Sequence, residues 1–584
     1  MVSCNLLITK FKGGLIVKRL IGLLLTLCML SAVLIGCGEK APTGGQSGDS
    51  SKDVAGAENT PEATGKQENG KGEDKEAESQ TADPLKDPYG LPNDLSAYPL
   101  KDNPTLTYWW PIDSFQAVAT KDMNEQEVWK EVEKITGVNI EFQHPAVGQE
   151  TEQFNLMISS DDLPDLICQS DSYKGGVTAG IDDGVFIDHS EIIDQYAPNY
   201  KAFRESDEDR RRTTMDDKGR VLGFYNLSPY SEWMWLGALI KKETLDKTGL
   251  PVPETMTEWY DFLKKCQEAG YDNPLNFDAS SGTVWTGLFC SAYGAQDWIF
   301  INKEGKADWG PIQPGMKDYL AEMSKWYKEG LIDKDFATRD YNSKMAFLIS
   351  DACAVSIESP DTLWGTWKEQ NNIDFVGSPY PVLKKGDKPT TTYKHWKNGG
   401  WPTSITMECK NPEAAARFLD FGYTAKGWEL FNFGLPERTH RIDESGMPYY
   451  HEESAMWTDP DKVPLSHRIW KYKIHQGPFI REEHNSNPML VSPGSYSGQI
   501  RQMWTEGTDA SPAVPPTSFT SEESAREADL STQLSTLRSE IFLQIIMGQK
   551  PIEEYDKFVE TAKSMGVQEW LGIWQAALDR YNAR

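Results

Sequence analysis

Positive charge is scarce in this sequence. The chain holds 59 lysine and arginine residues against 88 aspartate and glutamate residues, which gives a formal net charge of −29 over 584 residues. A protein that neutralises nucleic-acid phosphates presents a basic surface, so this balance argues against a nucleic-acid partner. Cysteine is scarce too, and the cysteines beyond residue 100 are odd in number and lack CxxC spacing. We interpret most of them as small buried apolar residues and leave open a disulfide between two of them: Cys168, Cys266, Cys290, Cys353 and Cys409.

Motifs of catalysis and metal binding are also missing. The sequence contains no P-loop and no GxSxG motif, and its eight histidines form neither an HExxH motif nor an i, i+4 pair. A glycosidase needs two carboxylates about 5–10 Å apart, and a chain this rich in acids marks no particular pair. The stretch 268–276 lacks the alternating oxygen ligands of a calcium loop. The sequence therefore predicts no catalytic site, no metal site and no cofactor.

Long apolar runs are absent beyond the N-terminal segment. Residues 20–36 are uncharged and apolar, and they follow Lys18 and Arg19. This run suits a signal-peptide core and is short for a transmembrane helix, which needs about 20 apolar residues. Its end, Leu34-Ile35-Gly36-Cys37, resembles the lipobox of bacterial lipoproteins, whose cysteine is acylated and becomes the new N-terminus. The resemblance implies a signal peptide over 1–36 and lipidation at Cys37; a simple N-terminal anchor is the alternative.

The segment after Cys37 is polar and of low complexity. Residues 38–87 contain no aromatic side chain and almost no large aliphatic one. Such a segment cannot bury enough apolar area to offset its chain entropy, so residues 37–100 are predicted to be a disordered linker. Residues 101–584 are long enough for two or three lobes with sizeable cores.

The folded part begins with alternating strand and helix patterns. Residues 106–110 and 138–142 are predicted strands, and 163–168 is a third, buried strand. Apolar residues at helical spacing lie between the first two strands and end at Gly137, and a short helix over 152–159 precedes the third. This order implies a parallel sheet with right-handed crossovers, and ligands of such sheets bind beyond the carboxyl ends of the strands. Further on, Thr257 is predicted to cap a helix that carries Trp259.

Several phrases resemble the family 1 extracellular solute-binding proteins, which are lipoprotein receptors of carbohydrate ABC importers and relatives of maltose-binding protein. The phrases occur in the family's order from about residue 105 to residue 584. They are DDLPDLI at 161–167, DGVFID at 183–188, DKGRVLGF at 217–224, LDKTGLPVPETMTEW at 245–259, KNPEAAARFLD at 410–420 and PIEEYDKFV at 551–559.

The resemblance implies a fold and a division of the chain. It implies an α/β protein of the two-lobed, type II periplasmic-binding-protein-like fold, with a mainly parallel sheet flanked by helices in each lobe and a ligand cleft between them. We expect the first lobe over 101–227 with 380–438 and the second over 228–379 with 439–584. The crossings between lobes are expected near Leu227-Ser228, near 379–381 and near Glu437-Arg438.

Binding an uncharged sugar requires flat aromatic faces for the pyranose rings and planar polar groups for the hydroxyls. For each tryptophan, packing in the core is the competing interpretation. By resemblance, the loops after Cys168 and after Ser356 contribute polar contacts. The candidate ligand-binding residues are Trp109, Trp110, Gln169, Ser170, Asp171, Trp233, Trp235, Trp285, Tyr293, Glu358, Asp361, Trp364 and Trp401.

The resemblance implies a binding protein rather than an enzyme. We expect it to capture an oligosaccharide by hinge closure and to deliver it to the permease subunits of an ABC transporter. We further expect a monomer, anchored through acylated Cys37 to the outer face of the cytoplasmic membrane of a Gram-positive-type bacterium. Two alternatives stay open: a surface receptor of the same fold that tethers or senses glycans, and an extracellular carbohydrate-active enzyme.

Overall fold

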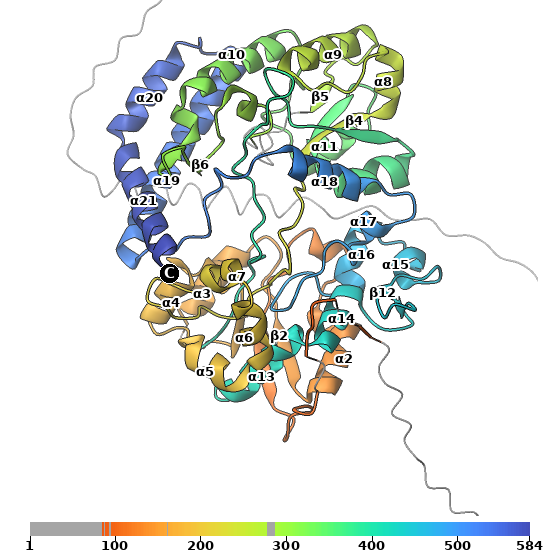
Figure 1. The fold of residues 1–584 in the computed structure, drawn as a ribbon, viewed down its shortest axis with the longest axis vertical. Coiled ribbons are helices and arrows are strands. Elements are labelled where there is room, and N and C mark those ends of the chain that lie inside the picture. Colours follow the sequence, from red (N-terminus) through yellow and green to blue (C-terminus); the bar gives the residue numbers. More distant parts are fainter. Residues whose placement is uncertain (1–84, 87, 93–94, 161, 277–286) are drawn as a thin grey trace, which may run out of the picture. The chain divides into compact units, whose positions relative to one another are not determined.

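Two four-stranded sheets dominate the structure, which is a computed structural model. It describes residues 85–86, 88–92, 95–160, 162–276 and 287–584. Thr81–Arg584 form one compact unit, and its described residues also contain two small two-stranded sheets. Figure 1 shows the larger sheets in different regions of this unit, each with helices beside it.

The first sheet has the strand order β10-β3-β1-β2. Strands β1 (Thr105–Trp109), β2 (Asn139–Gln143) and β3 (Leu166–Cys168) run parallel, and β10 (Thr403–Ile405) is antiparallel to β3. Helix α2 (Glu127–Thr136) buries Val128, Trp129 and Val132 and ends at Gly137, whose φ is 72°. The strands and helices predicted for this part are confirmed, with small shifts at their ends.

We call the part of the unit around this sheet the first lobe. Its remaining helices follow the strands along the chain. They are α3 (Glu150–Ile158), α4 (Gly176–Asp182), α5 (His189–Tyr196), α6 (Pro198–Glu205), α7 (Glu208–Thr213), α13 (Pro412–Asp420) and α14 (Ala425–Phe433).

The second sheet has the order β5-β8-β4-β9 and is mixed. Strand β4 (Gly237–Lys241) is antiparallel to both β8 (Val355–Glu358) and β9 (Phe375–Ser378), whereas β5 (Leu275–Asn276) is parallel to β8. The α/β class is confirmed, but this sheet is not mainly parallel. Strand β4 enters the sheet directly from a crossing segment, beside the C-terminal end of β8, where Gly237 pairs with Glu358. It therefore runs in the opposite direction to β8.

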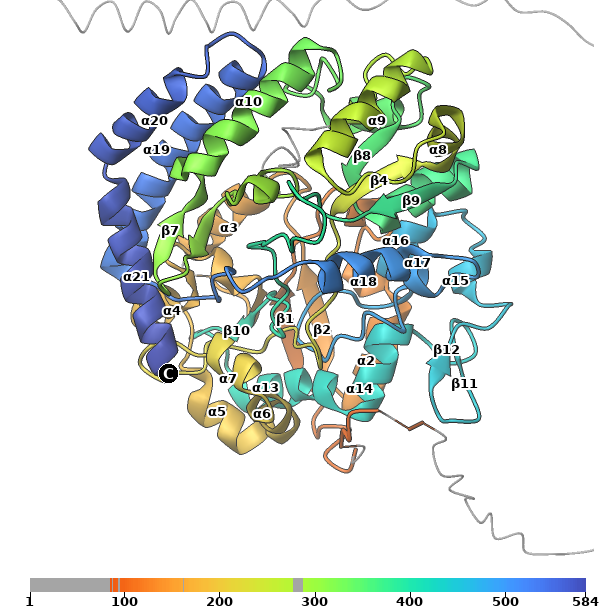
Figure 2. The same cartoon turned by 45° about the horizontal axis from the view of Figure 1, so that its top comes forward.

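We call the part around the second sheet the second lobe. Figures 1 and 2 show α10 (Pro314–Lys328), α19 (Ser521–Ile546), α20 (Glu554–Ser564) and α21 (Val567–Ala583) side by side at one end of it. Its elements also include α8 (Lys242–Thr248), α9 (Met256–Glu268), β6 (Ile299–Ile301), β7 (Ala307–Trp309), α11 (Tyr341–Leu348), α12 (Pro360–Leu363), α17 (Pro488–Val491) and α18 (Ser497–Gly507).

The N-cap of helix α9 lies two residues before the predicted one. Thr255, not Thr257, is the N-cap: its hydroxyl accepts a hydrogen bond from the Glu258 amide at 3.2 Å, and the Glu258 carboxylate accepts one from the Thr255 amide at 3.0 Å. This reciprocal pair is a capping box, which requires an acidic or amide residue three positions after the cap. Thr255 has Glu258 there, whereas Thr257 would have Tyr260, so the prediction of Thr257 was wrong.

The chain passes from the first sheet to the second over residues 225–236 and returns over 379–402. The segment from β11 (Arg441–Ile442) and β12 (Pro448–Tyr449) through α15 (Ala455–Thr458) and α16 (Leu465–Tyr472) leads to Phe479, whose ring packs on Phe431 of α14 at 5.3 Å. Gln126 also donates a hydrogen bond to the Trp470 carbonyl at 2.7 Å. We had expected residues 439–487 in the second lobe; because these contacts join them to the first, we propose that the first lobe extends to about residue 487.

One cluster of buried hydrophobic side chains extends through both lobes and forms the core.

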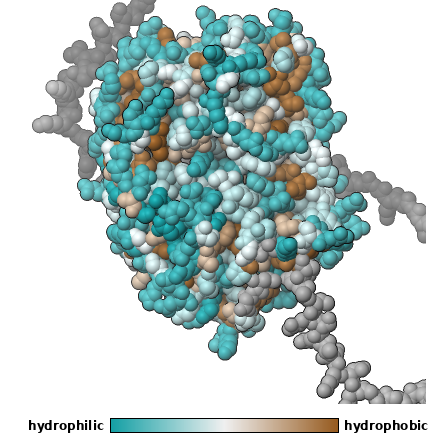
Figure 3. All heavy atoms as spheres, in the orientation of Figure 1, coloured by the Kyte–Doolittle hydropathy of each residue, from teal (hydrophilic) through white to brown (hydrophobic). Residues whose placement is uncertain are grey.

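The five cysteines of the described residues are buried and carry free thiols. On the face drawn in Figure 3 hydrophilic residues predominate, and hydrophobic ones gather only in small patches. Among the helices of the described ranges, none combines the length and apolar character that a membrane span requires.

Candidate functional site

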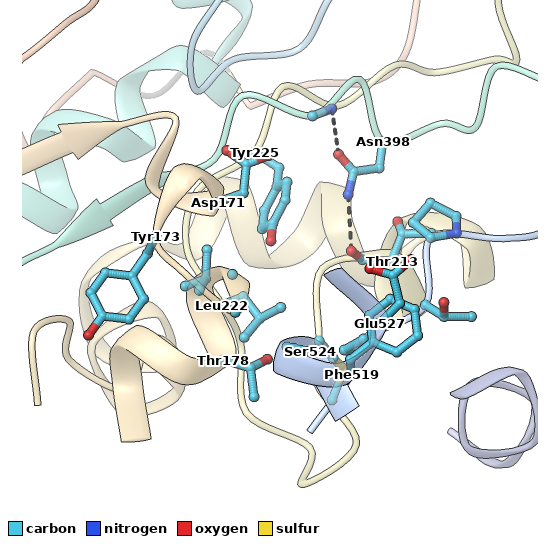
Figure 4. A pocket seen from close by; sticks show the side chains of 18 of the residues that line it. Asp171, Tyr173, Thr178, Thr213, Leu222, Tyr225, Asn398, Phe519, Ser524 and Glu527 are labelled. Carbon is cyan, nitrogen blue, oxygen red and sulfur yellow. Dashed lines mark hydrogen bonds between the residues drawn. The ribbon is translucent and has the colours of Figure 1, made fainter. Parts of the chain in front are cut away.

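A cavity of about 490 Å³ lies between the lobes. Its first-lobe wall comes from the loop after β3, the start of α4, the end of α7 and the return crossing; its second-lobe wall comes from the segment before α19, the first turns of α19 and the C-terminal residue. Figure 4 shows the side chains around it. The lining residues that matter below are Asp171, Tyr173, Tyr225, Asn398, Phe519, Glu527 and Arg584.

The side chain of Asn398, on the first-lobe wall of this cavity, is held in place by the backbone. The Asn398 amide donates to the Thr213 carbonyl at 3.0 Å, and its oxygen accepts from the Gly400 amide at 2.8 Å. Gly400 has a φ of 80°, a conformation that a side chain would strain. Burial raises the pKa of the Asp171 carboxyl, and no cation of the described residues forms an ion pair with it. The cavity thus contains one amide side chain of fixed orientation, that of Asn398, and the carboxyl of Asp171.

Arg584 joins the two lobes at the edge of the cavity. Its guanidinium donates to Asp217 at 2.9 and 2.6 Å and to the backbone carbonyls of Arg212 and Met215 at 3.0 and 2.6 Å. It also donates to the Ser518 hydroxyl. One turn earlier in α21, Arg580 bonds Asp217 at 2.6 Å. We call Asp217, Arg580 and Arg584 the C-terminal clamp.

A strip of aromatic side chains lies on the two crossing segments. Trp235 is 40% exposed and meets Tyr393 edge to face at 6.2 Å between ring centroids. The Tyr393 hydroxyl shares a hydrogen bond with His395 at 2.9 Å. Trp401 is half-buried and has a φ of 53°. Trp235 is thus exposed and Tyr393 and Trp401 are half-buried, and a sugar-stacking surface needs aromatic rings that are accessible in this way.

A buried cluster of ion pairs links residues at the junction of the two lobes. Arg501 of α18 bonds Asp361 at 3.1 Å and Glu483 at 3.3 Å, and Arg481 bonds Glu483 at 3.0 Å and Glu232 at 3.2 Å. Burial opposes ionisation of Glu483, but the two guanidinium groups hold its pKa well below the usual range. For Asp361 burial prevails and raises the pKa to about 6. The cluster ties a crossing segment to both lobes.

Several expected site residues lie in the core instead of on a cleft surface. Trp110 is 2% exposed and packs on Trp129 at 5.6 Å, Trp109 packs edge to face on Phe154, and Trp364 is 5% exposed beside Tyr496. Glu358 is buried and bonds Lys344 at 2.7 Å, and Ser170 bonds Ser404 at 2.7 Å. The structure gives these five a packing or structural environment; ligand contact by any of them stays a prediction.

The remaining expected residues are spread over the molecule. Asp171 lines the cavity, and Gln169 lies two residues before it, half-buried with a φ of 58°. Trp233 stacks on His484 at 3.8 Å and accepts a bond from Arg501 through its carbonyl. Tyr293 is half-buried in the second lobe. Cys37 and Trp285 lie outside the described residues.

Sequence reasoning missed most of the cavity wall. Tyr225 follows the phrase DKGRVLGF directly, so its position next to a phrase shared with the family was a usable signal. Phe519, Glu527 and Arg584 had none, because they reach the cavity only through the packing of α19 and α21 against the first lobe. Among the described residues, no group of three or more histidine, cysteine, aspartate or glutamate side chains is arranged to hold a metal ion.

The structure thus has two α/β lobes that are joined by crossing segments and enclose a cavity, an arrangement typical of ligand-binding proteins. The family model of the bacterial extracellular solute-binding proteins matches residues 108–427. This chain belongs to that family, which confirms the resemblance found in its sequence.

Individual relatives extend over most of the chain. The fructooligosaccharide ABC transporter substrate-binding protein FusA of Streptococcus pneumoniae is 22% identical over 537 residues, which cover 83% of this chain and 92% of FusA. Lipoprotein LipO of Bacillus subtilis is 26% identical over 332 residues, 54% of this chain and 64% of LipO. The crystal structure of the alginate-binding protein AlgQ2 without calcium ion aligns with a TM-score of 0.67 at 22% identity, covering 82% of this chain and 98% of AlgQ2. The type II periplasmic-binding-protein-like fold is thereby confirmed.

Proposed function

We propose that this protein captures an oligosaccharide between its lobes and delivers it to the permease of an ABC transporter. The observation that carries the proposal is the interlobe cavity, to which both lobes contribute an aromatic ring and a polar acceptor: Tyr225 and Asp171 from the first lobe, Phe519 and Glu527 from the second. Such walls match the two surfaces of a sugar, its apolar ring face and its hydroxyl edge.

Closure of the lobes supplies the signal for delivery. Because residues of both lobes line the cavity, a ligand that contacts both walls binds the closed arrangement better than an open one and shifts the population toward it. The C-terminal clamp adds contacts between the lobes that depend on the same closure. A permease that recognises the closed form would then distinguish loaded from empty receptors.

The relatives support this assignment without fixing the ligand. FusA is named for fructooligosaccharides and an ABC transporter, and AlgQ2 for alginate. LipO is named a lipoprotein, which supports the proposal that Cys37 is acylated and anchors a monomeric receptor to the outer face of the cytoplasmic membrane. We propose that the protein has no enzymatic activity and needs no cofactor.

A thermal-shift screen of the full-length chain against oligosaccharides tests the proposal. A ligand at 100 times its dissociation constant stabilises the folded state by about 2.7 kcal/mol, which is readily seen as a raised melting temperature. We expect a shift with at least one oligosaccharide and none with peptides. A shift with peptides alone would contradict the proposal.

The same samples separate the alternatives. Asp171 and Glu527 bring two carboxylates to one cavity, so product release is assayed after incubation with every sugar that binds. We expect the sugar to be recovered intact; cleaved product would establish the enzyme instead. Uptake that stops when the permease genes are deleted would favour import over a role in tethering or sensing.

A further inference from the structure

The charges that face the cavity are mainly negative. Asp171 and Glu527 carry carboxylates on opposite walls, and one Glu527 oxygen accepts a hydrogen bond from the Trp570 indole at 3.1 Å. Among the described lining residues Arg584 alone is cationic. The other polar groups are the hydroxyls and amide of Tyr173, Thr178, Thr213, Tyr225, Asn398, Thr517, Ser518 and Ser524.

The single cation of the lining is fully committed to the protein. A guanidinium has five N–H donors, and those of Arg584 go to Asp217 twice, to the carbonyls of Arg212 and Met215, and to the Ser518 hydroxyl. No donor remains for the bidentate contact by which arginine binds a carboxylate or sulfate. Releasing one for a ligand would break the clamp between the lobes.

The start of α19 does not replace this cation. A helix N-terminus attracts anions through its free N–H groups and its dipole. Here Thr520 and Glu523 form a capping box, and Glu522 and Glu523 place two carboxylates in the first turn. The N-terminus is therefore already satisfied by the chain's own acids.

We propose that the cavity selects uncharged oligosaccharides and rejects those that carry uronate groups. A uronate carboxylate brought into the cavity would lose water, would meet no available cation, and would be repelled by Asp171 and Glu527. Sugar hydroxyls gain from the same two groups, because an ionised carboxylate accepts a stronger hydrogen bond than a neutral acceptor does. This inference rests on the proposed function and narrows its ligand class.

Calorimetric titration of the full-length chain tests the selection with two panels. The neutral panel holds kestose, cellotriose, maltotriose, xylotriose and mannotriose; the acidic panel holds trigalacturonate and trimannuronate, and methyl-esterified trigalacturonate serves as the uncharged match of its parent. We expect binding within the neutral panel, and no acidic sugar within tenfold of the tightest neutral one. An acidic sugar that binds equally or more tightly would overturn the inference while leaving the proposed function standing; no binding in either panel would contradict the proposed function itself.

Two variants connect the selection to the carboxylates. Asp171→Asn keeps the shape of the side chain but removes its charge, and we expect about tenfold weaker binding of the tightest neutral sugar. Glu444→Gln, in the exposed turn between β11 and β12, removes the same charge outside the cavity and should leave the affinity unchanged. Tighter neutral binding by Asp171→Asn, or an equal effect of both variants, would show that the Asp171 carboxylate is not a hydroxyl acceptor and would overturn the inference.

Discussion

At the scale of single residues, buried charge is the most consequential feature of this molecule. The side chain of Arg501 is 3% exposed and neutralises both Asp361 and Glu483 while it bonds the Trp233 carbonyl. Removing one member of such a cluster leaves its partners buried without compensation, which destabilises a protein far more than the pair itself stabilises it. The junction of the lobes therefore depends on a few irreplaceable side chains.

Arg501→Leu tests this dependence. We expect the free energy of unfolding to fall by about 3–5 kcal/mol, because Asp361 would stay buried without a cation and Glu483 would keep only Arg481. Arg526→Leu is the matched control, since Arg526 pairs with Glu569 at the surface, where side-chain exposures are 43% and 51% and a salt bridge contributes about 0–1 kcal/mol. Equal losses in urea unfolding of the two variants would contradict the account.

A second residue-scale prediction concerns Asp420. Burial raises the pKa of its carboxyl to about 7, although Asn199 and the Tyr200 amide donate to it at 2.7 Å each. The folded state therefore binds a proton that the unfolded state has released above its pKa of about 4. Stability from this group is present below about pH 4 and is lost as the pH rises to about 7.

Asp420→Asn removes this titration. Relative to the wild type, the variant should gain stability steadily between about pH 4 and pH 7 and then level off, as measured by urea unfolding at a series of pH values. A difference between the two proteins that does not change with pH would contradict the assignment of a raised pKa to Asp420.

At the scale of elements, local sequence signals decide where helices begin. Helix α9 shows this most clearly, because two threonines compete for its first position and only Thr255 has an acid three residues later. Such a cap contributes about 1 kcal/mol.

Replacing each threonine in turn tests which of them caps helix α9. Thr255→Ala should lower the free energy of unfolding by about 1 kcal/mol, because the Glu258 amide loses its acceptor. Thr257→Ala changes an exposed residue inside the first turn and should have an effect near zero. If the Thr257 variant were the less stable one in thermal unfolding, the cap would be misassigned.

Sequence patterns predicted the structure well where it depends on neighbouring residues, and poorly where it depends on the packing of distant segments. The βαβ start of the first lobe was predictable because Val128, Trp129 and Val132 repeat at helical spacing and Gly137 ends the helix. The direction of β4 was not, since it depends on how the crossing enters the second sheet. Asp171 was predictable as a residue at the end of a strand, but Phe519 and Arg584 lie hundreds of residues away and reach the cavity only through tertiary packing.

At the scale of the whole molecule, the last turn of α21 and Arg584 link the second lobe to the first. Helix α21 belongs to the second lobe, yet Arg580 and Arg584 both bond Asp217 of the first. We propose that these contacts favour the closed arrangement and so contribute to ligand affinity, because a ligand that needs the closed form binds in proportion to the population of that form.

Asp217→Asn tests the C-terminal clamp. We expect three- to tenfold weaker sugar binding, since the closed form loses its charge-assisted contacts. Asp556→Asn breaks the Lys317–Asp556 pair, which lies within the second lobe, and should leave the affinity unchanged. Unaltered affinity in the Asp217 variant would show that the clamp does not contribute to closure.

The central claim is that an oligosaccharide binds in the cavity between the lobes, and calorimetric titration of Phe519→Ala tests it most directly. Phe519 belongs to the second-lobe wall and rests edge to face on Trp574 at 5.0 Å. For the sugar found in the screen, the account predicts one site per chain, about tenfold weaker binding by Phe519→Ala because a stacking face is lost, and wild-type affinity for Tyr449→Ala, which removes an exposed ring outside the cavity. Wild-type affinity in the Phe519 variant would place the sugar elsewhere and contradict the account.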